Sequence, residues 1–382
     1  MMKHPYLSEE HEIFRQSLRK FFEKEVVPYY EQWETERLIP RSLWLKMGEQ
    51  GFLCPNIAEK YGGSEADWGY SVVINEELER VGSGLVGIGL HNDIVVPYIT
   101  AYGTEEQKQR LLPGCVCGEK ITAIAMTEPG AGSDLSNIKT TAKLEGDHYI
   151  VNGQKTFITN GIHADLIVVA VKTNPSAIPK HKGVSLLMIE RGMPGFTRGR
   201  KLNKVGLHSQ DTAELIFEDC RVPKANLLGE EGKGFLYMMD KLQQERLVVA
   251  IAAQTAAEVM LQMTIDYVKT REAFGKPISA FQNTQFKLAE MATDIEMGRA
   301  FLDQLITEHI AGENVVTKVS MAKWKLTENA RKIATECMQL YGGYGYMEEY
   351  EIARRYRDIP VASIYAGTNE IMKMIIAKNL GL

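Results

Sequence analysis

The hydrophobic pattern changes twice along the chain, and this constrains the fold more than any other feature of the sequence. Apolar residues recur every three or four positions before residue 120 and after residue 234, as is typical of amphipathic helices. Helices are expected over residues 10–30, 40–50, 70–81, 235–270, 282–311 and 315–341. Between these two regions, short runs rich in β-branched or apolar residues predict strands over residues 121–126, 148–151, 166–171, 184–189 and 213–217.

This order predicts an α+β multidomain chain. We expect an N-terminal α-helical domain over residues 1–120, a middle β domain over 121–230 and a C-terminal four-helix bundle over 231–382. Inside the β domain, Asn152-Gly153 is a signal for a tight turn. The sequence GSGLVG at 82–87 matches the dinucleotide fingerprint, but the segment before it has helical periodicity. We therefore expect no nicotinamide site there, and small residues at a helix junction that leave room for a substrate tail.

Composition excludes several classes of function. The net charge of −5 argues against a nucleic-acid ligand, because proteins that bind nucleic acid usually carry a basic face. No uninterrupted apolar run approaches the roughly 20 residues of a membrane helix, so no membrane insertion is expected. Five cysteines form no disulfide framework and are expected as buried thiols, and the single C-x-C of Cys115 and Cys117 predicts no metal site. The first seven residues carry no secretory or transit pattern, which favours the cytoplasm, although a processed mitochondrial matrix chain would look the same.

A glycine-rich run, TEPGAGSD at residues 127–134, follows the first expected strand. Its small residues let a bulky ligand approach the backbone, and its hydroxyl groups can donate hydrogen bonds. Alone, it reads as an ordinary turn. Four further segments follow in order: KTFITNG at 155–161, REAFGK at 271–276, QLYGGYG at 339–345 and YAGTNE at 365–370. Together these five segments resemble the acyl-CoA dehydrogenase family over nearly the whole chain, which implies the acyl-CoA dehydrogenase fold.

The resemblance implies FAD as the cofactor. The positions that match flavin-ring contacts are Met126, Thr127, Gly132, Ser133, Phe157, Ile158 and Thr159. Many relatives have Trp where this chain has Phe157, so the packing surface is kept and the indole N–H is lost. The positions that resemble contacts to the pyrophosphate and adenine are Arg271, Phe274, Gln282, Gln339, Gly342, Gly343, Thr368 and Glu370. Family members draw some of these contacts from a neighbouring subunit, which implies a homotetramer.

The same resemblance implies the reaction. Family enzymes remove a proton from the α-carbon of an acyl-CoA thioester and transfer a hydride from the β-carbon to flavin N5, giving a trans-2-enoyl-CoA. Many members carry the base immediately before the Gly-Thr of the last motif, where this chain has Ala366. Long-chain and isovaleryl-CoA dehydrogenases carry it on a long helix of the C-terminal domain, and Glu245 falls at that position.

The local pattern around Glu245 supports this assignment independently. Met238, Leu242, Glu245, Val249 and Ala252 lie on one helix face, where Glu245 is the only charge. Burial in such a stripe would raise the pKa of the carboxyl and strengthen it as a base. The alternative is a glutamate at the helix rim, paired with Lys241 four residues earlier.

Other matching positions imply substrate contacts and leave several functions open. The substrate set is Ser133, Leu242, Gln243, Arg246, Ala366 and Gly367, with the Ala366 N–H bonding the thioester oxygen. We expect a medium- or long-chain fatty acyl-CoA as substrate and an electron-transferring flavoprotein as electron acceptor. The alternatives are a short branched-chain, isovaleryl-like dehydrogenase, an oxidase on the same fold, and a non-catalytic acyl-CoA-binding paralogue.

Overall fold

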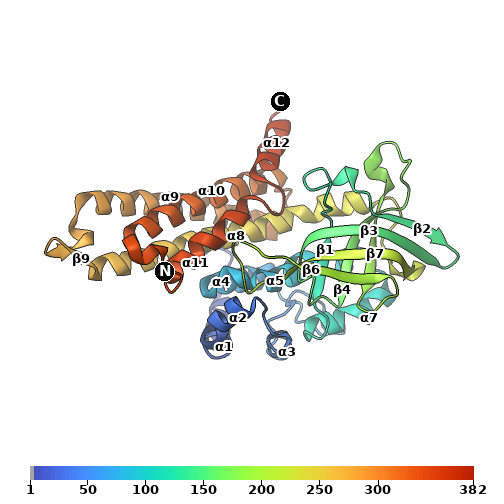
Figure 1. Ribbon diagram of the computed structural model, residues 1–382, viewed down its shortest axis with the longest axis horizontal. Helices are drawn as coiled ribbons and strands as arrows, with labels where there is room; N and C mark the ends of the chain where they lie inside the picture. Colours follow the sequence, from blue (N-terminus) through green and yellow to red (C-terminus); the bar gives the residue numbers. More distant parts are fainter. Residues whose placement is uncertain (1–3) are drawn as a thin grey trace.

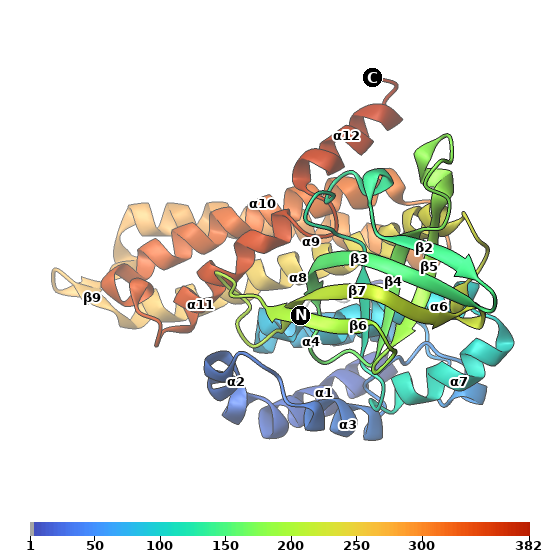
Figure 2. The ribbon, with the colours of Figure 1, turned by 45° about the vertical axis from the view of Figure 1, so that its right-hand side comes forward.

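The computed structural model describes residues 4–382 and follows the order helices, sheet, helices (Figure 1), which confirms the expected fold class. The N-terminal helices are α1 (Glu9–Glu25), α2 (Tyr30–Glu36), α3 (Arg41–Glu49), α4 (Trp68–Val81), α5 (Val86–Gly89), α6 (Val96–Tyr102) and α7 (Glu105–Val116). In the view of Figure 2, α1, α2, α3 and α7 lie below the sheet and the C-terminal helices. A π-helical turn, Leu90–Val95, connects α5 to α6.

The middle domain is one twisted sheet that contains all five predicted strands. Its strands are β1 (Thr122–Ala125), β2 (Thr141–Glu145), β3 (His148–Thr159), β4 (Leu166–Lys172), β5 (Val184–Glu190), β6 (Phe196–Lys201), β7 (Thr212–Pro223) and β8 (Leu227–Leu228). They are ordered β6-β7-β3-β2-β4-β5-β8, and β1 pairs in parallel with β4. The strands β4 and β5 are buried along nearly their whole length, which explains their continuous apolar sequence.

The tight turn predicted at Asn152-Gly153 is wrong. Both residues lie inside β3, opposite β7, where the register shifts at a bulge between Val151 and Gly153. The Asn152 amide donates to the Asp219 carboxylate at 3.0 Å across this bulge, so the side chain serves the strand pair instead of a turn. The turn that joins β2 to β3 lies at Gly146, which has a φ of +62°.

The C-terminal domain is built around α8 (Gly234–Thr270), which packs against α4, α9 (Gln282–Ile310) and α10 (Val316–Tyr341). Two shorter helices, α11 (Glu351–Asp358) and α12 (Asn369–Asn379), complete it, and α12 projects from the body in both ribbon views (Figures 1 and 2). Helix α8 is long and apolar enough to cross a membrane, but 67% of its most apolar window is buried inside the protein. Its hydrophobicity is therefore that of a core helix.

A buried charge cluster joins the N-terminal and C-terminal helices. Arg299 of α9 contacts Glu76 of α4 at 2.9 Å and Glu258 of α8 at 2.7 Å. Arg15 of α1 bridges Glu76 and Glu77, both at 2.9 Å. Because every charge in this cluster has an opposite partner, it fixes α4 against α8 and α9 without leaving an uncompensated ion.

The GSGLVG segment lies at the predicted helix junction, after α4, but the expected open space is absent. A Cβ at Gly84 would lie 2.0 Å from Ser209 Oγ, and one at Gly87 would lie 2.2 Å from Gln210 Oε1. These glycines therefore allow the N-terminal helices to pack directly on the loop before β7. The prediction that they leave room for a substrate tail is wrong.

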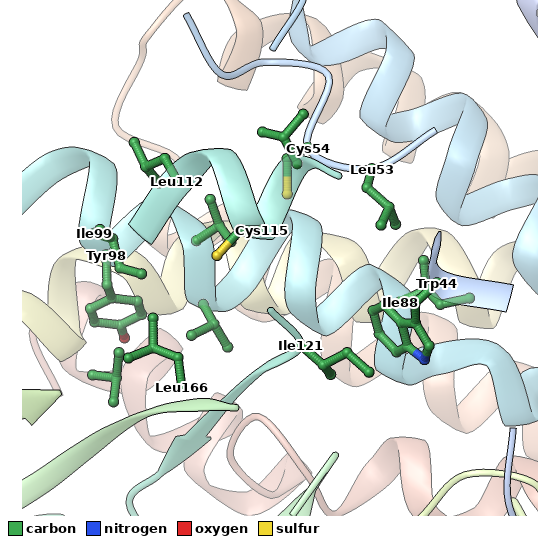
Figure 3. Close-up of a cluster of buried hydrophobic side chains, with 14 of the residues drawn as sticks. Trp44, Leu53, Cys54, Ile88, Tyr98, Ile99, Leu112, Cys115, Ile121 and Leu166 are labelled. Carbon is green, nitrogen blue, oxygen red and sulfur yellow. The ribbon is translucent and has the colours of Figure 1, made fainter. Parts of the chain in front are cut away.

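The thiols follow the prediction with one exception. Cys54, Cys115, Cys220 and Cys337 are buried, whereas Cys117 is exposed. None of the five forms a disulfide. Cys54 and Cys115 belong to the apolar core between α6, α7 and the sheet, shown with Tyr98, Leu112 and Leu166 in Figure 3.

Candidate active site

Glu245 lies on α8 with only 6% of its surface exposed. Its Oε1 accepts a hydrogen bond of 3.1 Å from the Tyr98 hydroxyl of α6. Burial raises the pKa of Glu245 to about 7, although the Tyr98 hydrogen bond and the nearby Arg246 charge act in the opposite direction. At neutral pH a substantial fraction of this carboxyl is ionised, and its raised pKa makes it a stronger base than an ordinary carboxylate, which suits proton abstraction from a weak carbon acid.

The alternative in which Glu245 is a rim glutamate paired with Lys241 is wrong. The Lys241 ammonium lies 3.2 Å from the Asp240 carboxylate and 5.4 Å from the centre of the Tyr102 ring. It therefore belongs to the outer face of α8, while Glu245 points to the interior. The apolar stripe around Glu245 is buried as predicted at Met238, Leu242 and Val249.

The chain brings Ala366 close to this part of α8. Arg246 is buried, and its Nε donates to the Ala366 carbonyl at 3.4 Å. Lys323 of α10, also buried, donates from Nζ to the Gly367 carbonyl at 2.7 Å. Ala366 and Gly367 have φ angles of +53° and +90°, so the segment is held in a left-handed conformation that alanine rarely adopts.

The N–H of Ala366 is free to bind a ligand. Within residues 4–382, no protein group accepts a hydrogen bond from it, although the residue is half-buried. Buried backbone N–H groups are almost always paired, so an unpaired one in a half-buried segment held by Arg246 is a candidate donor to a substrate oxygen.

Two other predicted substrate positions have different surroundings. Leu242 is buried in the stripe of Glu245. Gln243 accepts a hydrogen bond of 3.3 Å from the Val315 N–H through its Oε1, which fastens the beginning of α10 to α8. Its neighbour Gln244 donates to the Asp93 carbonyl in the π-helical turn at 2.6 Å. These amides connect helices around Glu245.

A buried ion pair supports the glycine-rich loop. Lys155 of β3 is fully buried, and its Nζ contacts Glu128 Oε1 at 2.8 Å and the Met126 carbonyl at 3.0 Å. Burial lowers the pKa of the Lys155 ammonium to about 8, while the Glu128 carboxylate opposes this shift. The pair fixes the first residues of the loop on β3, beside the Thr156 N–H that donates to the Thr127 carbonyl at 3.0 Å.

The loop itself presents unused polar groups. In the described part of the chain, the hydroxyls of Thr127, Ser133 and Thr159 make no hydrogen bond to protein, and the N–H groups of Thr127, Gly132 and Ser133 have no backbone acceptor. Gly132 and Ser133 are exposed, whereas Thr127 and Thr159 are half-buried. Donors grouped in this way fit the polar atoms of a planar cofactor.

Phe157 is the aromatic residue of the β domain that departs most from ordinary packing. Its side chain is 68% exposed, and its φ is +59° at a second bulge between Lys155 and Ile158. A strained backbone that exposes a large ring is a mark of a binding surface. Ile158 has its side chain in the core of the sheet, so only its backbone can reach a ligand.

A second set of predicted cofactor positions lies at the other end of α8. Arg271, Gln339, Gly342 and Gly343 line an open pocket of about 650 Å³, and the Arg271 guanidinium lies 5.4 Å from the centre of the Tyr344 ring. Phe274 is 96% exposed on the hairpin of β9 (Glu272–Ala273) and β10 (Lys276–Pro277). Gln282 is exposed at the first position of α9.

These two sets are not brought together within one chain. Glu245 and Arg271 are 26 positions apart on one continuous helix, so about 39 Å separates them at 1.5 Å per residue. Figure 1 shows the β9 hairpin at one end of the molecule and the sheet at the other. Thr368 and Glu370 open α12: Thr368 Oγ1 accepts from the Ile371 N–H at 3.4 Å, and Glu370 is exposed in the first turn.

Sequence reasoning did not find Tyr98, Lys155 or Lys323 as parts of the site. Lys155 had a detectable signal, because it is a charge at an inward-facing position of a strand. Tyr98 and Lys323 had none, since their partners lie far away in sequence. Among the residues that the structure describes, no group of three or more His, Cys, Asp or Glu side chains could hold a metal ion.

Comparisons with known proteins identify the family. Family models match residues 8–119 (acyl-CoA dehydrogenase, N-terminal domain), 123–220 (middle domain) and 232–381 (C-terminal domain). The chain is 49% identical to the pig (Sus scrofa) long-chain specific acyl-CoA dehydrogenase, mitochondrial, over 98% of this chain and 87% of that protein. It is 40% identical to an acyl-CoA dehydrogenase of Bacillus subtilis, over 98% and 99% of the two chains. A crystal structure of an acyl-CoA dehydrogenase from Geobacillus kaustophilus superposes with a TM-score of 0.99 at 71% identity and covers all of both chains. On these matches, the chain belongs to the acyl-CoA dehydrogenase family of flavoprotein enzymes.

Proposed function

We propose that this enzyme dehydrogenates medium- or long-chain fatty acyl-CoA thioesters between the α- and β-carbons, with Glu245 as the base that removes the α-proton. The observation that carries the proposal is the environment of Glu245. It is a buried carboxyl with a pKa raised to about 7, and it lies next in sequence to the arginine that holds the Ala366 segment. A carboxyl that ionises near neutral pH is poised to accept a proton.

Ala366 complements the base. As the α-proton leaves, negative charge develops on the thioester oxygen, and a positioned N–H stabilises it. The free Ala366 N–H is the group that supports this role, and the side chain of residue 366 is not needed for it. This accounts for an active site with alanine at the position where many relatives carry their base.

The residues present fit FAD. Phe157 offers an exposed ring, the 127–133 loop offers unpaired donors, and the Arg271 pocket offers a cation for a pyrophosphate. When bound, FAD supplies the acceptor for the two electrons and the hydrogen that leave the β-carbon. Because the Arg271 pocket is about 39 Å along α8 from Glu245, we propose that each FAD is shared between two chains of a homotetramer. An electron-transferring flavoprotein is the proposed acceptor of the electrons.

Chain length is proposed from relatives. The long-chain specific relative at 49% identity favours fatty acyl substrates. Anaerobic reduction of bound flavin by a ladder of straight and branched acyl-CoA thioesters tests this directly. A preference for short branched thioesters would identify an isovaleryl-like enzyme. Absence of reduction by every member of the ladder would indicate a non-catalytic binding protein, and oxygen consumption without an added acceptor would indicate an oxidase.

The variant Glu245→Gln tests the base. Glutamine keeps the shape of the side chain and removes its basicity, so flavin reduction should slow by at least the ~10²–10⁴-fold typical of a lost general base. Binding of the enoyl-CoA product should change little. Asp240→Asn is the matched control, because Asp240 lies on the same helix but on its outer face, and it should keep the parental rate. Reduction by Glu245→Gln near the parental rate would place the base elsewhere.

A further inference from the structure

We propose that Tyr98 is a positioning residue that holds the Glu245 carboxylate in place and sets the pH range over which it works as a base. This rests on the proposed function of Glu245. Tyr98 touches neither the reacting carbons nor the cofactor in this assignment, so it acts through Glu245 alone.

The geometry around Tyr98 is that of a fixed donor. The side chain is fully buried in the apolar core between α6, α7 and the sheet, where Figure 3 shows its ring with Ile99, Leu112 and Leu166. The ring therefore has no alternative position with comparable packing. Its hydroxyl is the one polar atom of the side chain, and it donates to Glu245 Oε1 at 3.1 Å.

The hydroxyl stays a donor at every pH of interest. Burial, and then the charge of the neighbouring Glu245, raise the pKa of the Tyr98 phenol well above its usual range. A donor to a carboxylate favours the ionised form over the neutral acid. Tyr98 therefore limits how far burial can raise the pKa of Glu245, and it fixes which carboxylate oxygen remains free for the substrate.

Few other groups compete for this role. On α8 itself, the Arg246 charge favours the ionised form of Glu245, but its guanidinium is directed to the Ala366 carbonyl. Lys323 of α10 donates to the Gly367 carbonyl. Asp93 of the π-helical turn accepts from the Asn75 amide at 2.7 Å. Among residues 4–382, Tyr98 is the only side chain with a hydrogen bond to Glu245.

The test is Tyr98→Phe, which keeps the ring and removes the donor. Its matched control is Tyr102→Phe, one helical turn later, whose hydroxyl donates to Asp240 at 2.6 Å outside the site. Flavin reduction by saturating acyl-CoA is followed anaerobically as a function of pH. A hydrogen bond to a charged group contributes enough to shift the ascending limb upward by on the order of one pH unit. Tyr98→Phe should therefore be slowed about tenfold on the acid side of the profile and approach the parental rate at high pH, while Tyr102→Phe should follow the parent.

A second readout does not depend on turnover. The carboxylic acid C=O band of Glu245, identified by its loss in Glu245→Gln, can be titrated by infrared difference spectroscopy. Its midpoint should move upward in Tyr98→Phe and stay in Tyr102→Phe. The proposal would be overturned by superimposable pH profiles, or by an equal loss of rate at all pH values with an unmoved infrared midpoint. Tyr98 would then be a packing residue. A parental rate in Glu245→Gln would instead overturn the proposed function.

Discussion

Glu245 should destabilise the folded enzyme in alkaline solution, and replacing it with glutamine should reverse this. The carboxyl has a pKa of about 7 in the folded protein and an ordinary value of 4.5. A raised folded pKa penalises ionisation in the folded state, so full stability is present below pH 4.5 and is lost progressively as the pH rises through 7. The difference of about 2.5 units corresponds to about 3 kcal/mol once the carboxyl is fully ionised.

The size of the effect depends on pH in a way that can be calculated. The folded and unfolded pKa values of Glu245 lower the free energy of unfolding by less than about 1 kcal/mol at pH 5 and by about 3 kcal/mol at pH 8.5. Unfolding entropy near 2.1 cal/mol/K per residue gives roughly 0.8 kcal/mol/K for this chain. The difference in Tm between Glu245→Gln and the parent should therefore increase by about 3 to 4 °C from pH 5 to pH 8.5, in favour of the variant. Burial of the new amide adds a penalty that is independent of pH, so the change with pH isolates the charge.

The assay is thermal unfolding of parent and variant at one protein concentration and one FAD loading, at several pH values. Asp240→Asn is the control, because the hydrogen bond from Tyr102 lowers the pKa of Asp240 below its ordinary range. Removing the Asp240 carboxylate should lower the Tm by a small amount that is the same from pH 5 to pH 8.5, and the Tm of this variant should not rise relative to the parent in alkaline solution. If the Tm of Glu245→Gln runs parallel to the parent over this range, Glu245 is not a desolvated carboxyl and the reasoning is refuted.

Two further variants test the cofactor residues. Arg271→Ala should weaken FAD binding by about 1.5–3 kcal/mol, roughly 10- to 150-fold, when apoprotein is titrated with FAD. The fully loaded variant should keep the parental rate of flavin reduction. Tight FAD binding with lost reduction would contradict the assignment of Arg271. Phe157→Gly should weaken FAD binding as well, yet denaturant unfolding of the apoprotein should show little or no loss of stability. The reason is that the 68% exposed ring buries little area and the φ of +59° suits glycine. A loss near the 3–5 kcal/mol typical of a buried Phe would show that Phe157 is a core residue.

The sequence predicted the parts of the fold in which burial and periodicity agree. The strands β4 and β5 are buried on both faces, so their residues form continuous apolar runs that are easily recognised. The strands β2 and β6 were not predicted, because only one residue of TAKLE and one of FTRGRK is buried and both segments carry charges. Asn152-Gly153 favours a turn locally, but pairing of β3 with β7 on both sides of the bulge outweighs that preference.

The candidate site could be predicted only where its residues signal their own environment. Glu245 interrupts an apolar helical stripe, which left both a buried carboxyl and a rim glutamate paired with Lys241 open, and the family resemblance with Ala366 favoured the first. Tyr98 is 147 positions away and Ala366 is 121 positions away in the sequence, so only tertiary structure reveals that they belong with it. The strained φ of Ala366 is likewise invisible in the sequence, because alanine gives no signal for a left-handed conformation.

Buried charges in this molecule differ in whether an opposite charge compensates them. Arg299 and Glu76 are buried and mutually compensated, so their charges are stabilised and chemically inert. Glu245 is also deeply buried, but within residues 4–382 its only hydrogen-bond partner is a phenol, and the adjacent Arg246 donates to the Ala366 carbonyl. A full ion pair would lower the pKa of Glu245 and remove its basicity, and no partner at all would keep it protonated at neutral pH. The phenol is the intermediate case, in which the carboxyl remains both ionisable and basic near pH 7, at a cost in stability.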